Sequence, residues 1–129
     1  METNLLNKKS KNEYYNSKEW RKTRKEKLDE QPLCVACASL GKKVNAEDLH
    51  HAIKYFEQDD DCRELLLLDK ENLVPLCKEC HKSIHGNKKI IGPWMLQYLY
   101  NLKTYICNKY FRQGIIIKWT EDKTYRKLK

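Results

Sequence analysis

The sequence predicts a small α+β protein whose short elements are fastened together by cysteines. With 129 residues, the chain has room for one compact core and an appended element, but not for two independent cores. Short apolar runs predict strands, and apolar residues at three- and four-residue spacings predict helices. Two CxxC pairs, Cys34/Cys37 and Cys77/Cys80, predict two knuckles that hold these elements together.

The first helix is expected at 18–28, after a polar leader at 1–13. Ser17 can cap this helix, because a serine hydroxyl accepts a hydrogen bond from the free N–H groups of the first turn. Pro32 follows its end, as is typical of helix termination. One face of the helix is expected to carry the side chains at every fourth position: Trp20, Arg24 and Leu28.

The middle of the chain predicts two strands, a loop and a short helix. The strands are expected at 49–53 and 72–76, and the helix at 80–85. Residues 54–63, with three consecutive aspartates, are expected to form a solvated loop. The run at 65–68 fits a strand or a helical turn equally well. Gly86 stands where a helix often ends in a left-handed residue.

Residues 87–129 are predicted to form an extension, a helix followed by a strand. Pro93 can start the helix at 94–112, Gly114 ends it, and the strand is expected at 115–119. Four aromatic residues mark the helix, and packing in a core or a dimer is favoured over base stacking for them: Trp94, Tyr98, Tyr105 and Tyr110.

The net charge of +8 is unevenly distributed along the chain. Residues 8–27 hold nine basic against three acidic residues, and residues 87–129 hold ten against two, whereas residues 28–86 hold seven against twelve. Basic flanks around an acidic centre suit a polyanion held by the flanks, and an ordinary solvated surface remains the alternative. We see no signal peptide and no apolar run that could span a bilayer, and therefore expect a soluble protein of the reducing cytoplasm.

The two CxxC pairs predict a tetrahedral Cys₄ zinc site, because each knuckle presents two thiolates to one ion. Thirty-nine residues separate the pairs, so the intervening chain must fold as a unit of its own over the zinc. A structural zinc is favoured because four thiolates leave no position open for water. A redox CxxC or buried free cysteines are the alternatives, and Cys62 and Cys107 are expected to act as small apolar residues.

All four histidines of the chain fall in two short segments, which favours a shared site. His81 and His85 are spaced i and i+4 on a predicted helix and project from one face. Cys80 precedes His81 by about 100° around the helix, so it can face the zinc while His81 points elsewhere.

His50 and His51 are neighbours on a predicted strand and must point to opposite faces. One can bind a metal ion while the other, neutral at cellular pH, takes a proton from water. A metal ion and a general base together suffice to hydrolyse a phosphodiester. A second zinc site, or histidines that merely cap the fold, remain alternatives.

Together these residues resemble the HNH endonuclease family, also called the ββα-metal or His-Me finger nucleases, and especially its small phage enzymes. The resemblance covers roughly residues 14–86 and implies a zinc-stapled, treble-clef-like ββα-metal core. It is carried by the leading helix and by the ordered segments Cys34–Cys37, Leu49–Ile53 and Asn72–Gly86.

The resemblance implies a role for each site residue. His50 falls on the first metal-ligand position and His51 on the general base. Asn72 falls on the residue that steadies the loop carrying the base. His81 falls on the second ligand, and His85 on a third that some branches use. The implied reaction cleaves DNA to 5′-phosphate and 3′-hydroxyl ends with one Mg²⁺, or with Mn²⁺, Ni²⁺ or another divalent ion.

The implied partner is DNA, which we expect to be double-stranded, in a bacterial or phage-infected cell. A homodimer or a phage packaging assembly is a further possible partner, and no membrane is expected. The candidates for DNA contact are Arg21, Arg24, Lys88 and Lys89. An additional grip by the C-terminal basic residues is a weaker alternative: Arg112, Lys118, Lys123, Arg126 and Lys127.

Two other classes of function fit parts of the sequence. A non-catalytic zinc-finger DNA-binding module explains the cysteines and the basic flanks, but leaves His51 beside His50 unexplained. A protein-interaction module explains the aromatic helix and leaves all the histidines without a task. The endonuclease hypothesis accounts for the most residues.

Overall fold

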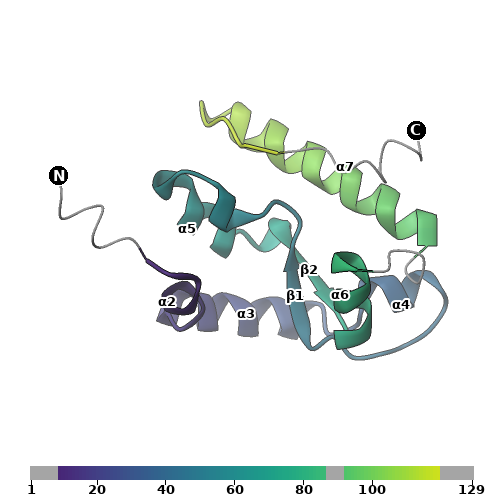
Figure 1. Ribbon diagram of the computed structural model, residues 1–129. Helices are drawn as coiled ribbons and strands as arrows, with labels where there is room; N and C mark the ends of the chain where they lie inside the picture. Colours follow the sequence, from purple (N-terminus) through teal and green to yellow (C-terminus); the bar gives the residue numbers. More distant parts are fainter. Residues whose placement is uncertain (1–8, 87–91, 120–129) are drawn as a thin grey trace.

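Helices surround a two-stranded antiparallel sheet in the computed structural model (Figure 1). The structure describes residues 9–86 and 92–119, and the expected α+β class is confirmed for them. In chain order, the elements are α2 (Lys11–Tyr15), α3 (Lys18–Glu30), α4 (Val35–Ser39), β1 (Asp48–His51), η1 (Tyr55–Glu57), α5 (Asp60–Leu68), η2 (Lys70–Asn72), β2 (Leu73–Leu76), α6 (Lys78–His85) and α7 (Gly92–Phe111), where η marks a 3₁₀ turn.

The helix expected at 18–28 is present as α3 and extends to Glu30. The Ser17 hydroxyl accepts a hydrogen bond from the Trp20 N–H at 3.1 Å, which satisfies one of the free donors at the start of the helix. Trp20 is buried on the inner face of α3. The short helix α2, in front of it, starts with a capping box.

The two strands pair in a register that places His50 opposite Val74. Because successive side chains of a strand point to opposite faces, Leu49 and His51 share one face and Asp48 and His50 share the other. α6 follows β2 directly and contacts both strands. This order, two antiparallel strands and then a helix, puts the histidines of α6 beside β1.

Buried apolar side chains form two cores, and α7 supplies both. The first core surrounds Val74 and Leu76 beside the cysteines, and the second surrounds Leu49 and Leu73. α7 contributes Met95, Leu96 and Leu99 to the first core and Ile106 and Tyr110 to the second. Burying a side chain of this size contributes about 1.5–3 kcal/mol. The helix of the expected extension is therefore built into the hydrophobic core.

Neither described range holds a helix with the length and apolar character that a bilayer crossing needs.

The loop expected at 54–63 is wrong in its second half, because α5 begins at Asp60. Asp59 is the residue before the helix, and Asp60 and Asp61 occupy its first turn, where the helix dipole favours negative charge. Consecutive aspartates are thus as typical of a helix start as of a solvated loop. The run at 65–68 is the end of this helix.

The expected left-handed glycine after α6 is wrong. Gly86 has φ −127° and ψ −99°, and its N–H donates to the carbonyls of Lys82 and Ser83. A left-handed glycine does follow α7, where Gly114 has φ +82°. Lys88 and Lys89 lie outside the described residues, as do Lys123, Arg126 and Lys127.

The strand expected at 115–119 is also wrong, because no partner strand lies beside this segment in the described part of the chain. Gln58 takes that place: its side chain accepts from the Lys118 N–H at 2.8 Å and donates to the Lys118 carbonyl at 2.7 Å. Exposure nevertheless alternates along the segment, and Ile116 is 79% exposed. The alternate residues pack against the second core: Ile115, Ile117 and Trp119.

The aromatic residues of α7 divide between the core and the surface. Tyr110 is buried in the second core, as core packing predicts. Trp94 is 56% exposed and stacks on Tyr98, with ring centroids 5.4 Å apart. Tyr105 lies at the surface and donates a hydrogen bond to Glu71 at 3.0 Å.

Candidate functional site

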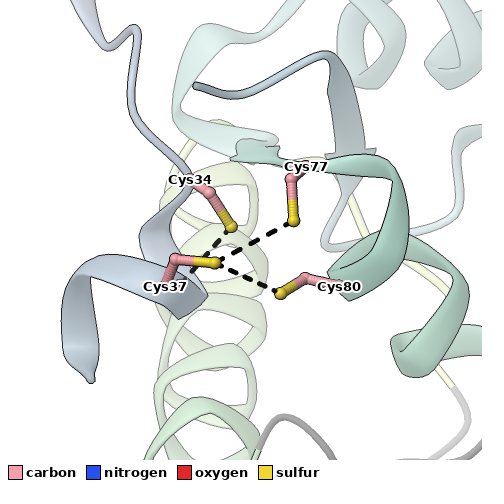
Figure 2. Close-up of side chains that lie close together, drawn as sticks. All are labelled: Cys34, Cys37, Cys77 and Cys80. Atoms are coloured by element: carbon pink, nitrogen blue, oxygen red, sulfur yellow. Dashed lines mark hydrogen bonds between the residues drawn. The ribbon is translucent and has the colours of Figure 1, made fainter. Parts of the chain in front are cut away.

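Four cysteine thiols converge between α4 and α6 (Figure 2). Cys34 and Cys77 are the residues that precede α4 and α6, and Cys37 and Cys80 lie in the first turns of these helices. The Cys37 N–H donates to the Cys34 sulfur at 3.4 Å. The start of a helix therefore turns each CxxC segment into a knuckle with both thiols on one side.

The spacing of the sulfurs fits a tetrahedral ion. The Cys37 sulfur lies 3.9 Å from that of Cys77 and 3.8 Å from that of Cys80, and all four sulfurs lie within 4.8 Å of one another. Four thiolates at the usual Zn–S distance of about 2.3 Å are about 3.8 Å apart. The cluster can therefore hold a structural zinc, and its four thiolates leave no position open for water.

Without a cation, two of these thiols, those of Cys37 and Cys80, resist ionisation. Burial, assisted by the bond with Cys34, raises the pKa of Cys37 to about 11, and burial also raises the pKa of Cys80. A bound ion would stabilise the thiolates and release their protons. Cys62 and Cys107 lie outside the cluster and are partly buried, in keeping with small apolar residues.

A second group of side chains that could hold a metal ion comes from β1 and α6. The histidine group consists of His50 on β1 and of His81 and His85 on one face of α6. The Nε2 atoms of His81 and His85 are 3.2 Å apart, and the rings of His50 and His85 are centred 5.1 Å apart. Two nitrogens bound at about 2.0–2.1 Å to a tetrahedral ion are about 3.4 Å apart. The three imidazoles can therefore share one ion and leave a position open.

One helix thus contributes to both groups of potential metal ligands. Cys80 belongs to the cysteine cluster and the next residue, His81, belongs to the histidine group. Burial lowers the pKa of His50 well below its ordinary value, and the neighbouring His85 and His81 lower it further. A neutral imidazole is the form that binds metal.

The carboxylate of Asp48 fixes the orientation of His81. Asp48 Oδ2 lies 3.0 Å from His81 Nδ1, which must carry the proton because an ionised carboxylate only accepts. The Nε2 lone pair of His81 then points to the other histidines. Asp48 shares a strand face with His50, because the two residues are two positions apart on β1. This spacing could have placed Asp48 beside the histidine group from the sequence.

We expect Asp48→Ala to weaken metal binding by the histidine group about 10- to 100-fold, because a carboxylate behind a ligating histidine holds its tautomer and ring direction. Calorimetric titration of the zinc-loaded protein with Ni²⁺ measures the affinity. Asp29→Ala, which removes an exposed carboxylate paired with Lys25 on α3, is the control. An unchanged affinity for Asp48→Ala would show that the carboxylate does not orient the ligand.

His51 lies apart from the metal-ligand groups, inside a cage of aromatic rings. The ring centroids of Tyr55, Trp20 and Tyr15 are 4.8, 5.3 and 6.4 Å from that of His51. Its Nε2 lies 3.1 Å from the carbonyl oxygen of Leu67. Because a carbonyl can only accept, Nε2 carries the proton, and the Nδ1 lone pair is left to take one.

Burial lowers the pKa of His51 to about 4, although the bond to Leu67 opposes the shift. The imidazole is therefore neutral at pH 7. A neutral ring with one nitrogen tied to the backbone is a candidate general base with a fixed tautomer.

Asn72 is fully buried and bonded on every side. Its Oδ1 accepts from the Ile53 N–H at 2.7 Å, and its Nδ2 donates to the carbonyls of Ile53 and Leu66, both at 3.0 Å. The side chain therefore fixes the backbone two residues after His51. It lies outside the histidine group.

All four histidines line one cleft with a volume of about 410 Å³. Lys11 and Lys54 also line this cleft, although Lys11 was expected in the leader and no function was expected for Lys54. The two described candidates for DNA contact, Arg21 and Arg24, lie on α3 and are not part of the lining. The Arg24 guanidinium donates to the Glu47 carbonyl at 2.7 Å, which ties it to the fold.

Comparison with known proteins gives no match: no family model, no curated protein and no solved structure resembles this chain closely enough to be significant. The function is therefore inferred from the cysteine cluster, the histidine group and the cleft.

Proposed function

We propose that the protein is a metal-dependent DNA endonuclease or nickase of the HNH type. The observation that carries the proposal is the cleft, which is lined both by the three histidines of the metal group and by His51. β1 keeps the two tasks apart, because adjacent residues of a strand point to opposite faces and so separate the ligand His50 from the base His51. We assign the unit β1–β2–α6, together with the cysteine cluster, to the treble-clef-like ββα-metal fold.

His51 acts as the general base in the proposed reaction. Its Nδ1 accepts a proton from the attacking water while Leu67 holds Nε2, and Asn72 steadies the backbone behind it. His50 and His81 would hold the divalent ion, with His85 as a third ligand. A bound Mg²⁺, Mn²⁺ or Ni²⁺ would neutralise the phosphate and stabilise the leaving oxygen. The products are 5′-phosphate and 3′-hydroxyl ends.

The proposed substrate is double-stranded DNA. The basic flanks and the two cleft lysines provide positive charge for the phosphate backbone. One active site makes one cut, so double-strand cleavage would require a homodimer or two successive nicks. We place the protein in the cytoplasm of a bacterial or phage-infected cell, where thiols stay reduced and available to zinc. A role in phage packaging would add a larger assembly as a partner.

We expect Lys11→Gln and Lys54→Gln each to reduce the slope of log affinity against log salt concentration by about one, because each lysine releases roughly one counterion from a phosphate. Fluorescence anisotropy with a duplex in EDTA measures binding without cleavage. Lys42→Gln, at an exposed position after α4, is the control. Unchanged slopes for both cleft variants would exclude phosphate contacts by these lysines.

A supercoiled-plasmid assay tests the proposed activity. The zinc-loaded protein should convert the plasmid to nicked or linear forms with Mg²⁺ or Mn²⁺, and EDTA should stop the conversion. No cleavage with any divalent ion, together with salt-sensitive DNA binding, would contradict the proposal. That result would favour a non-catalytic zinc-finger DNA-binding module, which also requires the Cys₄ cluster and the basic flanks.

A further inference from the structure

The chain from the end of α5 through η2, residues 66–72, holds His51 at two points. The Leu67 carbonyl accepts a hydrogen bond from His51 Nε2 at 3.1 Å. Asn72 bonds both the N–H and the carbonyl of Ile53, two residues after His51. The position of the His51 ring therefore depends on the position of this segment, which we call the support segment.

The support segment is held in turn by the last turns of α7. Asp69 accepts hydrogen bonds from Lys109 Nζ at 2.6 Å and from the Tyr110 hydroxyl at 2.8 Å. Glu71 accepts from Lys109 Nζ at 2.7 Å and from the Tyr105 hydroxyl at 3.0 Å. Three side chains of α7 thus clamp two carboxylates of the support segment.

Burial makes the loss of one partner of this clamp more costly than the loss of one partner of a surface ion pair. The Asp69 side chain is only 11% exposed, and that of Lys109 is 25% exposed. A carboxylate at such a depth relies on its donors, because an unpaired buried charge is strongly destabilising. Burial alone would lower the pKa of Lys109, but its bonds to Asp69 and Glu71 raise it, so the amine stays charged.

Apolar packing fixes α7 against the same segment. Ile106 is fully buried in the second core together with Leu66 and Leu67. In Figure 1, α7 passes close to α5, at whose end the support segment begins. The polar clamp at Asp69 and the apolar contact at Leu67 therefore act on one short stretch of chain.

We infer that α7 is a positioning element for the proposed general base, and that Lys109 is its principal positioning residue. Lys109 does not line the cleft. It acts through Asp69 on the support segment, and the support segment fixes the position of the His51 ring. The inference rests on the proposed function only where it calls His51 a general base. The link from Lys109 to the His51 tautomer depends on the contacts alone.

The tautomer of His51 gives a readout that needs no cleavage. In the zinc-loaded protein, ¹⁵N-resolved NMR of the histidine rings should show His51 protonated at Nε2. In Lys109→Met, which removes the charge and keeps an unbranched side chain of nearly the same length, that signal should weaken or give way to a mixture of tautomers. Lys109→Arg should restore it. Lys25→Met is the control, because it removes an exposed lysine ion-paired on α3.

Cleavage kinetics give a second readout. We expect Lys109→Met to lower kcat about ten- to a hundredfold with little change in KM for DNA, because a base displaced by less than an ångström loses its alignment while substrate contacts remain. Tyr110→Phe, which removes one hydroxyl and keeps the buried ring, should change both readouts in the same direction by less. It serves as the test if Lys109→Met does not fold.

A folded Lys109→Met protein with the wild-type His51 signal and the wild-type kcat would overturn the inference. So would a Tyr110→Phe protein without any change, if Lys109→Met is unfolded. If the wild-type protein cleaves no DNA, the proposed function fails, and the tautomer comparison alone decides whether α7 positions His51.

Discussion

His51→Ala is expected to lower the rate of DNA cleavage by at least about 10²–10⁴-fold, the usual contribution of a general base. The reason is geometric: the Nδ1 lone pair of His51 is free to take a proton while Nε2 is bonded to Leu67. The three imidazoles of the histidine group should stay in place, because His51 is not one of them. The time course of supercoiled-plasmid conversion with Mg²⁺ or Mn²⁺ measures the loss.

Deleting a buried ring leaves a cavity, so folding must be checked in the same variant. His51 is 8% exposed and packs among aromatic rings. We expect zinc content and far-UV circular dichroism to match the wild type. His51→Gln keeps a polar side chain of intermediate size and offers no base, so it should be equally inactive. Full cleavage by either folded variant would refute the role assigned to His51.

Cys77→Ser is expected to lose zinc and, with it, the cooperative fold. Structural zinc in small modules binds with about 10–16 kcal/mol, which is as large as the whole stability of a typical domain. Cys77 is also part of the first core, beside Val74 and Leu76. Loss of the ion therefore removes the fastening between α4, β2 and α6.

Atomic absorption for zinc and thermal unfolding of the purified protein measure this effect. Cys62→Ser is the matched control, since Cys62 lies outside the cysteine cluster and should leave zinc content unchanged. We also expect the Cys77→Ser protein to be less soluble, because apolar side chains of the first core become exposed. A folded Cys77→Ser protein with a full complement of zinc would contradict the Cys₄ assignment.

The candidate site was largely predictable from the sequence because its spacing is local. A CxxC pair at a helix start, or two histidines at i and i+4, brings its own two side chains together whatever the rest of the fold does. Alternation along β1 likewise separates His50 from His51. The resemblance to HNH enzymes adds the roles of these residues, and those roles stay predictions.

What the sequence did not reveal depends on contacts between distant segments. Asp48 meets His81 across 33 positions, and Lys109 meets Asp69 across 40. A strand was expected at 115–119, but the backbone of Lys118 pairs with the side chain of Gln58 and not with a strand. Periodicity describes one segment at a time, so it could not identify α7 as a support of the site.

The central proposal is that the protein holds a structural zinc in the cysteine cluster and one exchangeable divalent ion in the histidine group. Its most direct test follows one preparation through removal and return of the exchangeable ion. Zinc per chain and the rate of plasmid cleavage are measured in untreated protein, after brief EDTA treatment and desalting, and after addition of Mg²⁺ or Mn²⁺. The account predicts that zinc stays at one ion per chain throughout, while cleavage is lost with EDTA and restored by the added ion. Cleavage absent in every sample, with zinc and DNA binding retained, would contradict it.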